Sequence, residues 1–365
     1  MQACLYSPKG GFYSDRSNRI NEHFGTSPAS HPAFGALIAR QLEQMWRLLG
    51  EPTVFHLVEV GSGDGGLAQA IVNACRLSFP QFARSLYYVA VDYQPPIYQS
   101  PGHALNRTDE NDGAFPSNVQ ATSTEVHWVR ADGLSSFRNV AGCILCNELL
   151  DNFPFHRFVI QEGNIKEVFL MLSGDNLVEV FDDPSSPAIE ERLKGLRVSL
   201  TEGYRGEVCI ALDDWAAQLS RALERGFVLT IDYGELAEDL YSPGNAQGTM
   251  VCYRQHKATN DPYRHFGLQD ITCHVDFTSL IQLGEQYGLS TVGLTRQSGF
   301  LQNLGFSALL EGLRGQSISA ARAEFESMAL MTLVEPEEYG DFKVLAQAKG
   351  VGLGSTLLGF EGKEQ

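Results

Sequence analysis

Apolar residues recur every three or four positions between Pro32 and Leu49, which is the spacing of an amphipathic helix. Beyond this stretch, short and nearly continuous apolar runs alternate with helical or longer segments. The runs typical of strands are FHLVEVG (55–61), LYYVAVD (86–92), VHWVRAD (126–132), GCILCN (142–147), FVLTIDYG (227–234), STVGLTRQ (290–297) and FKVLAQAKG (342–350). Helical spacing follows the first run, in LAQAIVNACRLSF (67–79). This pattern predicts an α/β fold with a mostly parallel sheet covered on both faces.

The segment between the fourth and fifth runs is too long for a simple crossover. Residues 155–183 alternate in polarity and carry turn signals at 162–164 and 173–175, which predicts an antiparallel meander. Two helical stretches follow: 189–196, and 213–226, which starts on an acidic cap and ends at Gly226. We predict that residues 155–226 form an inserted antiparallel and helical lid subdomain on the substrate side.

Charge and composition narrow the possible partners. The chain has 365 residues, 43% of them hydrophobic, a net charge of −17 and a pI near 4.9. A nucleic-acid partner is not expected, because phosphate binding needs an excess of Lys and Arg. No apolar window reaches the length of a membrane span, and the opening MQACLYSPKGGFY lacks the pattern of a signal peptide. These features predict a protein without membrane insertion and with a cytoplasmic address.

Seven cysteines are scattered through the apparent strands and helices, as is usual for reduced thiols. Cys143 and Cys146 have the spacing of a redox motif or half a zinc site. However, no second CxxC or His pair completes it, and both lie in an apolar run, so we interpret them as core residues. A metal set of His256, His265, His274 and Asp276 fits no common ligand spacing, and no metal is expected.

The stretch VEVGSGDGG (58–66) fits both GxGxG and GxGxxG, and an ordinary strand-to-helix turn is the plain alternative. Glu59 favours S-adenosylmethionine over a dinucleotide. A dinucleotide fold has an apolar residue at this position, whereas a site for S-adenosylmethionine needs an acid to hold the methionine portion. The predicted contacts in the turn are Gly61, Ser62, Gly63 and Gly65.

The second and third strand-like runs each end in an acid. Asp92 is placed to accept hydrogen bonds from ribose hydroxyls, and Asp132 to reach the adenine amine. For both, a plain turn residue is the alternative.

The fourth run ends abruptly in Asn147 and Glu148, and Asp151 follows three residues later. A half-buried carboxylate costs several kcal/mol unless it has a partner, so either the fold or a ligand must supply one. We predict that Glu148 is the principal catalytic carboxylate, with Asp151 as its helper and Asn147 as a local partner. The alternative is that Asn147 caps the next turn and Glu148 pairs with a framework arginine.

Other polar residues are predicted to organise the lid or bind substrate, not to do chemistry. His156 is a candidate proton relay, although a packed or exposed histidine is the alternative. The full set is His156, Asp232, Tyr233, Tyr253, Arg254, His256, His274 and Asp276.

Several stretches resemble one family across nearly the whole chain, the MidA-type methyltransferases, which include the mitochondrial complex I assembly-factor methyltransferase. The matching stretches are LYSPKGGFY (5–13), FGTSP (24–28), FGALIARQLEQMW (34–46), LVEVGSGDGGLA (57–68), CNELLDNFPFHRF (146–158), IDYG (231–234), GTMVCYRQH (248–256) and DITCHVDFTSL (270–280). The resemblance implies a class I S-adenosylmethionine-dependent methyltransferase fold with a seven-stranded sheet. It also implies a protein substrate, since better-studied members methylate an arginine of a respiratory-complex subunit.

The expected organisation combines the pattern and the resemblance. An N-terminal helical segment (1–50) precedes a Rossmann-like core (51–154 and 227–350), which the insertion (155–226) interrupts. Residues 236–280 would form an active-site loop, and the polar loop 94–124 would flank the chemistry. The oligomeric state stays open, a dimer included.

Carboxylates suit a guanidine acceptor, because a protonated guanidinium has no free lone pair and must lose a proton. They would also hold it by bidentate hydrogen bonds. Other amine acceptors would be served by the same groups. Two rival interpretations stay open at this point: a non-catalytic assembly factor that binds S-adenosylmethionine, and a nicotinamide-dependent oxidoreductase that uses the GxGxxG pattern.

Overall fold

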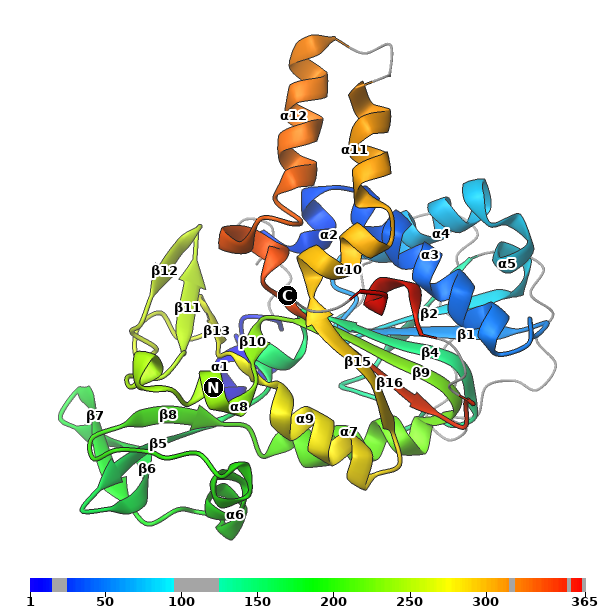
Figure 1. Ribbon diagram of the computed structural model, residues 1–365. Coiled ribbons are helices and arrows are strands. Elements are labelled where there is room, and N and C mark those ends of the chain that lie inside the picture. The colour runs from blue at the N-terminus through cyan, green and yellow to red at the C-terminus, as the bar shows by residue number, and fades with distance from the viewer. Residues whose placement is uncertain (15–24, 95–124, 315–318, 353–355, 363–365) are drawn as a thin grey trace. The chain divides into compact units, whose positions relative to one another are not determined.

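The computed structural model describes residues 1–14, 25–94, 125–314, 319–352 and 356–362 (Figure 1). Two compact units make up the chain. The first consists of Met1–Phe24, Leu150–Ala216 and Tyr233–Leu283, and the second of Gly25–Leu149, Ala217–Asp232 and Gly284–Gln365. The first unit thus contains parts of three predicted segments: the N-terminal helical segment (1–50), the insertion (155–226) and the active-site loop (236–280). Most of the predicted loop 94–124 lies outside the described residues.

A seven-stranded sheet forms the centre of the second unit, in the order β15-β16-β9-β4-β1-β2-β3. β16 runs antiparallel to both β15 and β9, and the other neighbouring strands pair in parallel. The strands are β1 (Phe55–Val60), β2 (Leu86–Asp92), β3 (Val126–Arg130), β4 (Val140–Asn147), β9 (Leu223–Asp232), β15 (Ser290–Arg296) and β16 (Lys343–Lys349). The predicted sheet is confirmed, because all seven apolar runs supply its strands.

Helices cover this sheet and close its hydrophobic core. The helices of the second unit are α2 (Ser27–Ser30), α3 (Ala33–Leu48), α4 (Gly66–Ser78), α5 (Pro80–Ser85), α10 (Gln297–Asn303), α11 (Phe306–Arg314) and α12 (Ala320–Met331). The stripe predicted between Pro32 and Leu49 is the buried face of α3. Its Phe34, Ile38 and Leu42 are fully buried in one cluster with residues of β1, α4 and α10.

The first unit contains smaller sheets. One has the order β7-β6-β5-β8, another β12-β11-β13, and β10 pairs with β14. The strands are β5 (His156–Gln161), β6 (Asn164–Ser173), β7 (Asn176–Asp182), β8 (Arg205–Val208), β10 (Gly234–Glu235), β11 (Val251–Arg254), β12 (Lys257–Thr259), β13 (Asp270–Thr272) and β14 (Val275–Asp276). The helices are α1 (Gln2–Tyr6), α6 (Pro187–Leu196) and α8 (Ala237–Leu240), while α7 (Ala211–Ala222) and α9 (Phe277–Gln286) continue into the second unit. The predicted meander is confirmed.

Two expectations about local structure were wrong. The helix predicted to end at Gly226 ends at Ala222, because the next residues already pair with β4 as part of β9. Residues 236–280, predicted as a loop, contain the strands β11, β12 and β13. These strands are too short to show a clear alternation of polar and apolar residues in the sequence.

Candidate cofactor and acceptor sites

The glycine turn joins β1 to α4 in the second unit. Gly61, Gly63 and Gly65 have φ values of 75°, 53° and 82°, a left-handed conformation that glycine adopts without strain. A Cβ atom at Gly61 would lie 2.8 Å from Cδ1 of Leu149, whereas at Gly63 no described atom lies within 4 Å. The backbone at Gly63 is therefore open to a ligand at the N-terminus of the 13-residue helix α4.

Asp92 is tied to this turn. Its Oδ2 accepts a hydrogen bond from the backbone N–H of Gly63 (2.9 Å) and its Oδ1 from that of Gln94 (2.8 Å). Burial raises the pKa of Asp92, and these two donors oppose the shift. Each carboxylate oxygen has a second lone pair, so Asp92 can still accept from ribose hydroxyls. Asp132, the predicted adenine contact, is exposed just after β3.

Glu59 lies in the core beside the turn and is 3% exposed. Its Oε2 accepts a hydrogen bond from the hydroxyl of Tyr88 at 2.7 Å. Burial raises the pKa of Glu59 to about 8, so the carboxyl group is largely protonated at neutral pH. A cation nearby would favour its ionised form.

Glu148 follows β4 with a φ of 49°, which is unusual for a residue with a side chain. Its Oε1 accepts hydrogen bonds from the backbone N–H of Ser27 (2.9 Å) and from Nδ2 of Asn147 (3.1 Å). Ser27 is the first residue of α2, within the FGTSP stretch. The carboxylate thus has two donors from the fold, and the N-terminus of a short helix holds it in place.

Asp232 lies at the end of β9 and is fully buried. Its Oδ2 accepts a hydrogen bond from the backbone N–H of Leu149 (3.1 Å), and the N–H of Glu148 donates to the carbonyl of Ile231 (2.9 Å). The end of β9 therefore fixes the turn that carries Glu148.

Asp151 belongs to the first unit, in a single helical turn at Leu150–Asn152. It is 4% exposed, and its Oδ2 accepts a hydrogen bond from the hydroxyl of Tyr233 (2.6 Å). Its Oδ1 is buried and has no hydrogen-bond partner among the described residues. Burial raises the pKa of Asp151 to about 6. This carboxyl group can accept a further donor.

A second buried acid, Asp270, lies near Asp151. Its Oδ1 accepts a hydrogen bond from Nδ2 of Asn152 (3.1 Å), and burial together with the charge of Asp151 raises its pKa to about 7. The hydroxyl of Tyr13 donates to Oδ1 of Asn152 (3.0 Å), and that of Tyr6 to the Asn152 carbonyl (3.2 Å). The stretch LYSPKGGFY thus supplies two tyrosines to the acid cluster.

Sequence reasoning missed Ser27, Asn152 and Asp270. All three lie in stretches already matched to the family, which is the signal that could have drawn attention to them. Their contacts join residues more than a hundred positions apart, so no local pattern reveals them.

The remaining predicted residues have mainly structural contacts. Nδ1 of His156 lies 2.7 Å from Oε1 of Glu167 on the neighbouring strand β6. Asp276 accepts hydrogen bonds from the N–H and hydroxyl of Ser279 and so caps α9. The ring of His274 packs edge-on against that of Tyr233, with centroids 5.5 Å apart.

The predicted residues in CYRQH lie on β11 and the turn after it. Tyr253 is half-buried, and burial and then the charge of Asp151 raise its pKa. Nη1 of Arg254 is 3.4 Å from Nε2 of His265, and His256 is exposed in the turn. Among the described residues, no three His, Cys, Asp or Glu side chains are grouped to hold a metal ion.

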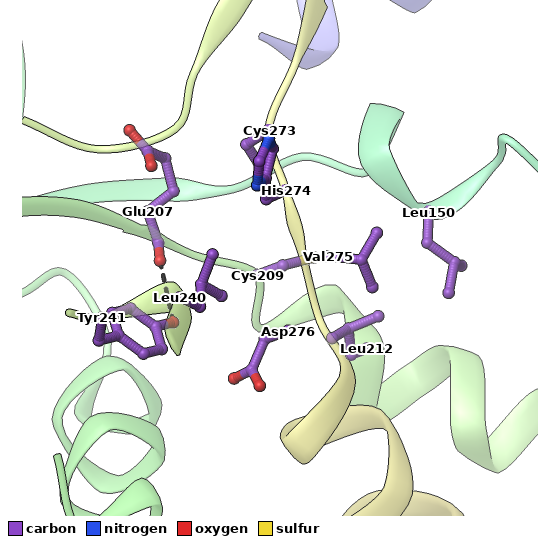
Figure 2. Close-up of a pocket in the computed structure, with 10 residues that line it drawn as sticks. All are labelled: Leu150, Glu207, Cys209, Leu212, Leu240, Tyr241, Cys273, His274, Val275 and Asp276. Carbon is purple, nitrogen blue, oxygen red and sulfur yellow. Dashed lines mark hydrogen bonds between the residues drawn. The ribbon is translucent and has the colours of Figure 1, made fainter. Parts of the chain in front are cut away.

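Figure 2 shows a small cavity in the first unit, with the hydroxyl of Tyr241 donating to the carbonyl of Glu207 (3.1 Å). Its volume of about 10 Å³ suits one water molecule and no substrate. The lining residues are Leu150, Glu207, Cys209, Leu212, Leu240, Tyr241, Cys273, His274, Val275 and Asp276. His274 and Asp276 therefore line a space too small for an acceptor.

The sheet order, the glycine turn and the acids at the ends of β1 and β2 and just after β4 are those of a class I methyltransferase fold that binds S-adenosylmethionine. A family profile described as "putative S-adenosyl-L-methionine-dependent methyltransferase" matches residues 37–295. The chain belongs to this family and is an S-adenosylmethionine-dependent methyltransferase. The residues of the glycine turn fit this cofactor, because Gly63 leaves space at a helix N-terminus and Asp92 adjoins it.

Curated relatives and solved structures agree with this assignment and confirm the resemblance found in the sequence. The mitochondrial protein arginine methyltransferase NDUFAF7 homolog of Drosophila melanogaster is 28% identical, over 96% of this chain and 80% of the relative. The human protein arginine methyltransferase NDUFAF7 is 26% identical, over 93% and 77%. A Burkholderia thailandensis structure bound to S-adenosyl-homocysteine superposes with a TM-score of 0.77, at 25% identity, over 99% of this chain and 88% of that one.

These relatives correct one prediction. The curated relatives are named as mitochondrial proteins, which contradicts the cytoplasmic address predicted from the opening residues. In the part of the chain that the structure describes, no helix is both long enough and apolar enough to span a membrane.

Proposed function

We propose that this methyltransferase acts on the side chain of an arginine in a protein substrate. The main support is the set of curated relatives, which are named as protein arginine methyltransferases and align over most of this chain. The net charge of −17 and the acids after β4 suit a cationic acceptor.

In this proposal Glu148 holds the guanidinium and accepts its proton. S-adenosylmethionine, when bound, supplies a methyl group activated by its sulfonium. An acceptor nitrogen that takes a methyl group must lose a proton, and Glu148 would accept that proton. Ser27 and Asn147 donate to Oε1 of Glu148, and these two hydrogen bonds orient the carboxylate.

Asp151 is proposed as the second carboxylate, with Asp270 next to it. The support is the free acceptor capacity of Oδ1 of Asp151 in a buried setting. Burial raises the pKa of both carboxyl groups, to about 6 for Asp151 and about 7 for Asp270, and the charge of Asp151 adds to the rise at Asp270. The pair therefore has the capacity to take up a proton near neutral pH.

The test is Glu148→Gln. This change keeps the hydrogen bonds from Ser27 and Asn147 but removes the charge, so methyl transfer should fall by about a hundredfold or more. Binding of S-adenosylhomocysteine, measured by calorimetry, should change little. Transfer is measured as tritium moved from labelled S-adenosylmethionine into extract protein, with methylarginine identified by mass spectrometry.

Glu285→Gln, which removes a carboxylate from an exposed position on α9, serves as the matched control. Full turnover in Glu148→Gln would refute the role of Glu148. Cofactor binding by the parent chain without transfer to any protein would instead favour a non-catalytic assembly factor.

A further inference from the structure

Helices α11 and α12 form a hairpin at the edge of the second unit, and Figure 1 shows them side by side, extending away from the sheet. The inner side of α12 packs into the core through Leu330, which is fully buried. On the other side, Phe325 is 71% exposed and Met328 is 66% exposed. These residues and Ala321 lie at positions i, i+4 and i+7 and so share one stripe of the helix.

Aromatic and methionine side chains are enriched at the centres of protein interfaces, and exposing both on one helical stripe is unusual. We call Ala321, Phe325 and Met328 the outer stripe of α12. Leu309 on α11, 38% exposed, adds to the apolar surface of the hairpin.

The charges around the outer stripe indicate what kind of partner it binds. Glu324 is exposed next to Phe325, Glu311 is exposed on α11, and Glu335, Glu337 and Glu338 are exposed just after α12. The segment 306–341 has seven carboxylates and two arginines, which gives it a net charge of −5. A partner that is both apolar and cationic complements this surface.

The same charges argue against two other occupants. Cellular membranes carry a negative surface charge, which repels an acidic face. A second copy of the chain would bring the same acidic hairpin and the same net charge of −17.

The base of the hairpin is joined to the element that holds Glu148. Oε2 of Glu326, on the inner side of α12, lies 3.2 Å from Nε2 of His31, which directly follows α2. The Tyr339 hydroxyl lies 2.7 Å from where a Cβ of Gly25 would be. Since Ser27 of α2 donates to Glu148, the hairpin borders the candidate acceptor site within one unit.

We propose that the outer stripe of α12 is the docking surface for the protein substrate, and that it binds an apolar segment of that protein flanked by arginine or lysine. The proposal rests on the proposed function. It adds a binding site for a part of the substrate protein other than the arginine that is methylated. Docking outside the reacting centre raises affinity and specificity without entering the chemical step.

The experiment measures binding of a short fluorescein-labelled peptide of alternating Arg and Leu by fluorescence anisotropy. The parent chain should bind this peptide, and the double variant Phe325→Ser, Met328→Ser should bind it about tenfold or more weakly. Leu77→Ser is the matched control, because Leu77 is an 86% exposed apolar residue on α4, a helix that is not part of the hairpin. Retained thermal stabilisation by S-adenosylhomocysteine shows that each variant is folded.

Equal peptide binding by the double variant and by Leu77→Ser would overturn the proposal. The proposal would also be overturned if the parent chain bound phosphatidylglycerol vesicles and the double variant did not. Self-association of the parent chain, seen by light scattering and lost in the double variant, would overturn it too, because the stripe would then bind a second copy of the chain. A counterpart peptide with Glu in place of Arg should not bind, and binding of it would refute the cationic partner. Peptide binding without any methyl transfer would leave the docking surface intact and count against the proposed function alone.

Discussion

At the scale of single residues, the candidate sites are built from acids whose burial or backbone conformation costs free energy. Glu148 has two donors and a left-handed backbone, Asp151 has an oxygen without a partner among the described residues, and Glu59 is buried against one tyrosine. Such costs are common at functional sites, where a ligand or substrate completes the interactions.

Glu59 gives a prediction about pH. Its pKa is about 8 in the folded protein, above the ordinary value, so the folded state keeps a proton that the unfolded chain releases. The stability due to the neutral carboxyl is therefore fully present in acid and is lost as the pH rises toward 8. Each pKa unit corresponds to about 1.4 kcal/mol.

Glu59→Gln keeps an acceptor for Tyr88 but cannot ionise. The variant should have a melting temperature close to the parent at pH 5 and higher than the parent at pH 8.5, while its affinity for S-adenosylmethionine falls. Thermal unfolding followed across this pH range checks the result. A melting-temperature difference that does not vary with pH would show that Glu59 is not protonated in the folded state.

At the scale of elements, short segments position the chemistry. The N-terminus of α2 supplies the N–H of Ser27 to Glu148, and the end of β9 fixes Leu149 through Asp232. In the first unit, the segment around α1 and the strand β13 surround Asn152 with Tyr6, Tyr13 and Asp270. These contacts give a role to FGTSP and LYSPKGGFY, for which the sequence offered none.

Ser27→Pro tests the role of α2. Proline is favoured in the first turn of a helix, and Thr26, with φ −129° and ψ 156°, already has the conformation that precedes proline. The change therefore removes the N–H donor to Glu148 while leaving α2 intact. We expect about a tenfold loss of methyl transfer, from one charge-assisted hydrogen bond, with little change in cofactor affinity.

Ser27→Ala is the comparison for this variant, because it retains the N–H. The hydroxyl of Ser27 is buried without a partner among the described residues, so its removal should cost little. Equal transfer rates for the proline and alanine variants would mean that the Ser27 donor does not matter to Glu148.

At the scale of the whole molecule, a cofactor bound at the glycine turn would stabilise the second unit. A ligand at a hundred times its dissociation constant adds about 2.7 kcal/mol to the free energy of unfolding. S-adenosylhomocysteine should therefore raise the melting temperature, whereas NAD should not, since Glu59 is an acid where a dinucleotide fold has an apolar residue.

The measurement is a thermal-shift comparison of the two ligands, repeated on Gly63→Val. Valine is strained at a φ of 53° and fills the open space at the turn, so the variant should lose the shift. A shift with NAD that equals or exceeds that with S-adenosylhomocysteine would contradict the assigned cofactor.

The sequence by itself determined the α/β class, all seven strands of the main sheet, the glycine turn and the acids at the ends of β1 and β2 and just after β4. Apolar periodicity, glycine spacing and the residue that ends each strand are local features, and they report directly on burial and on the carboxyl edge of a parallel sheet. The meander was predictable for the same reason.

Only the tertiary structure decided which partners these acids have. Ser27 and Glu148 are 121 positions apart, and Asn152 and Asp270 are 118 apart, so their hydrogen bonds arise from chain packing that no periodicity encodes. The tertiary structure also made Asp232 and Asp276 structural acids and left Phe325 and Met328 exposed. Burial and partner choice are properties of the folded chain, because they depend on what the rest of the molecule places beside each residue.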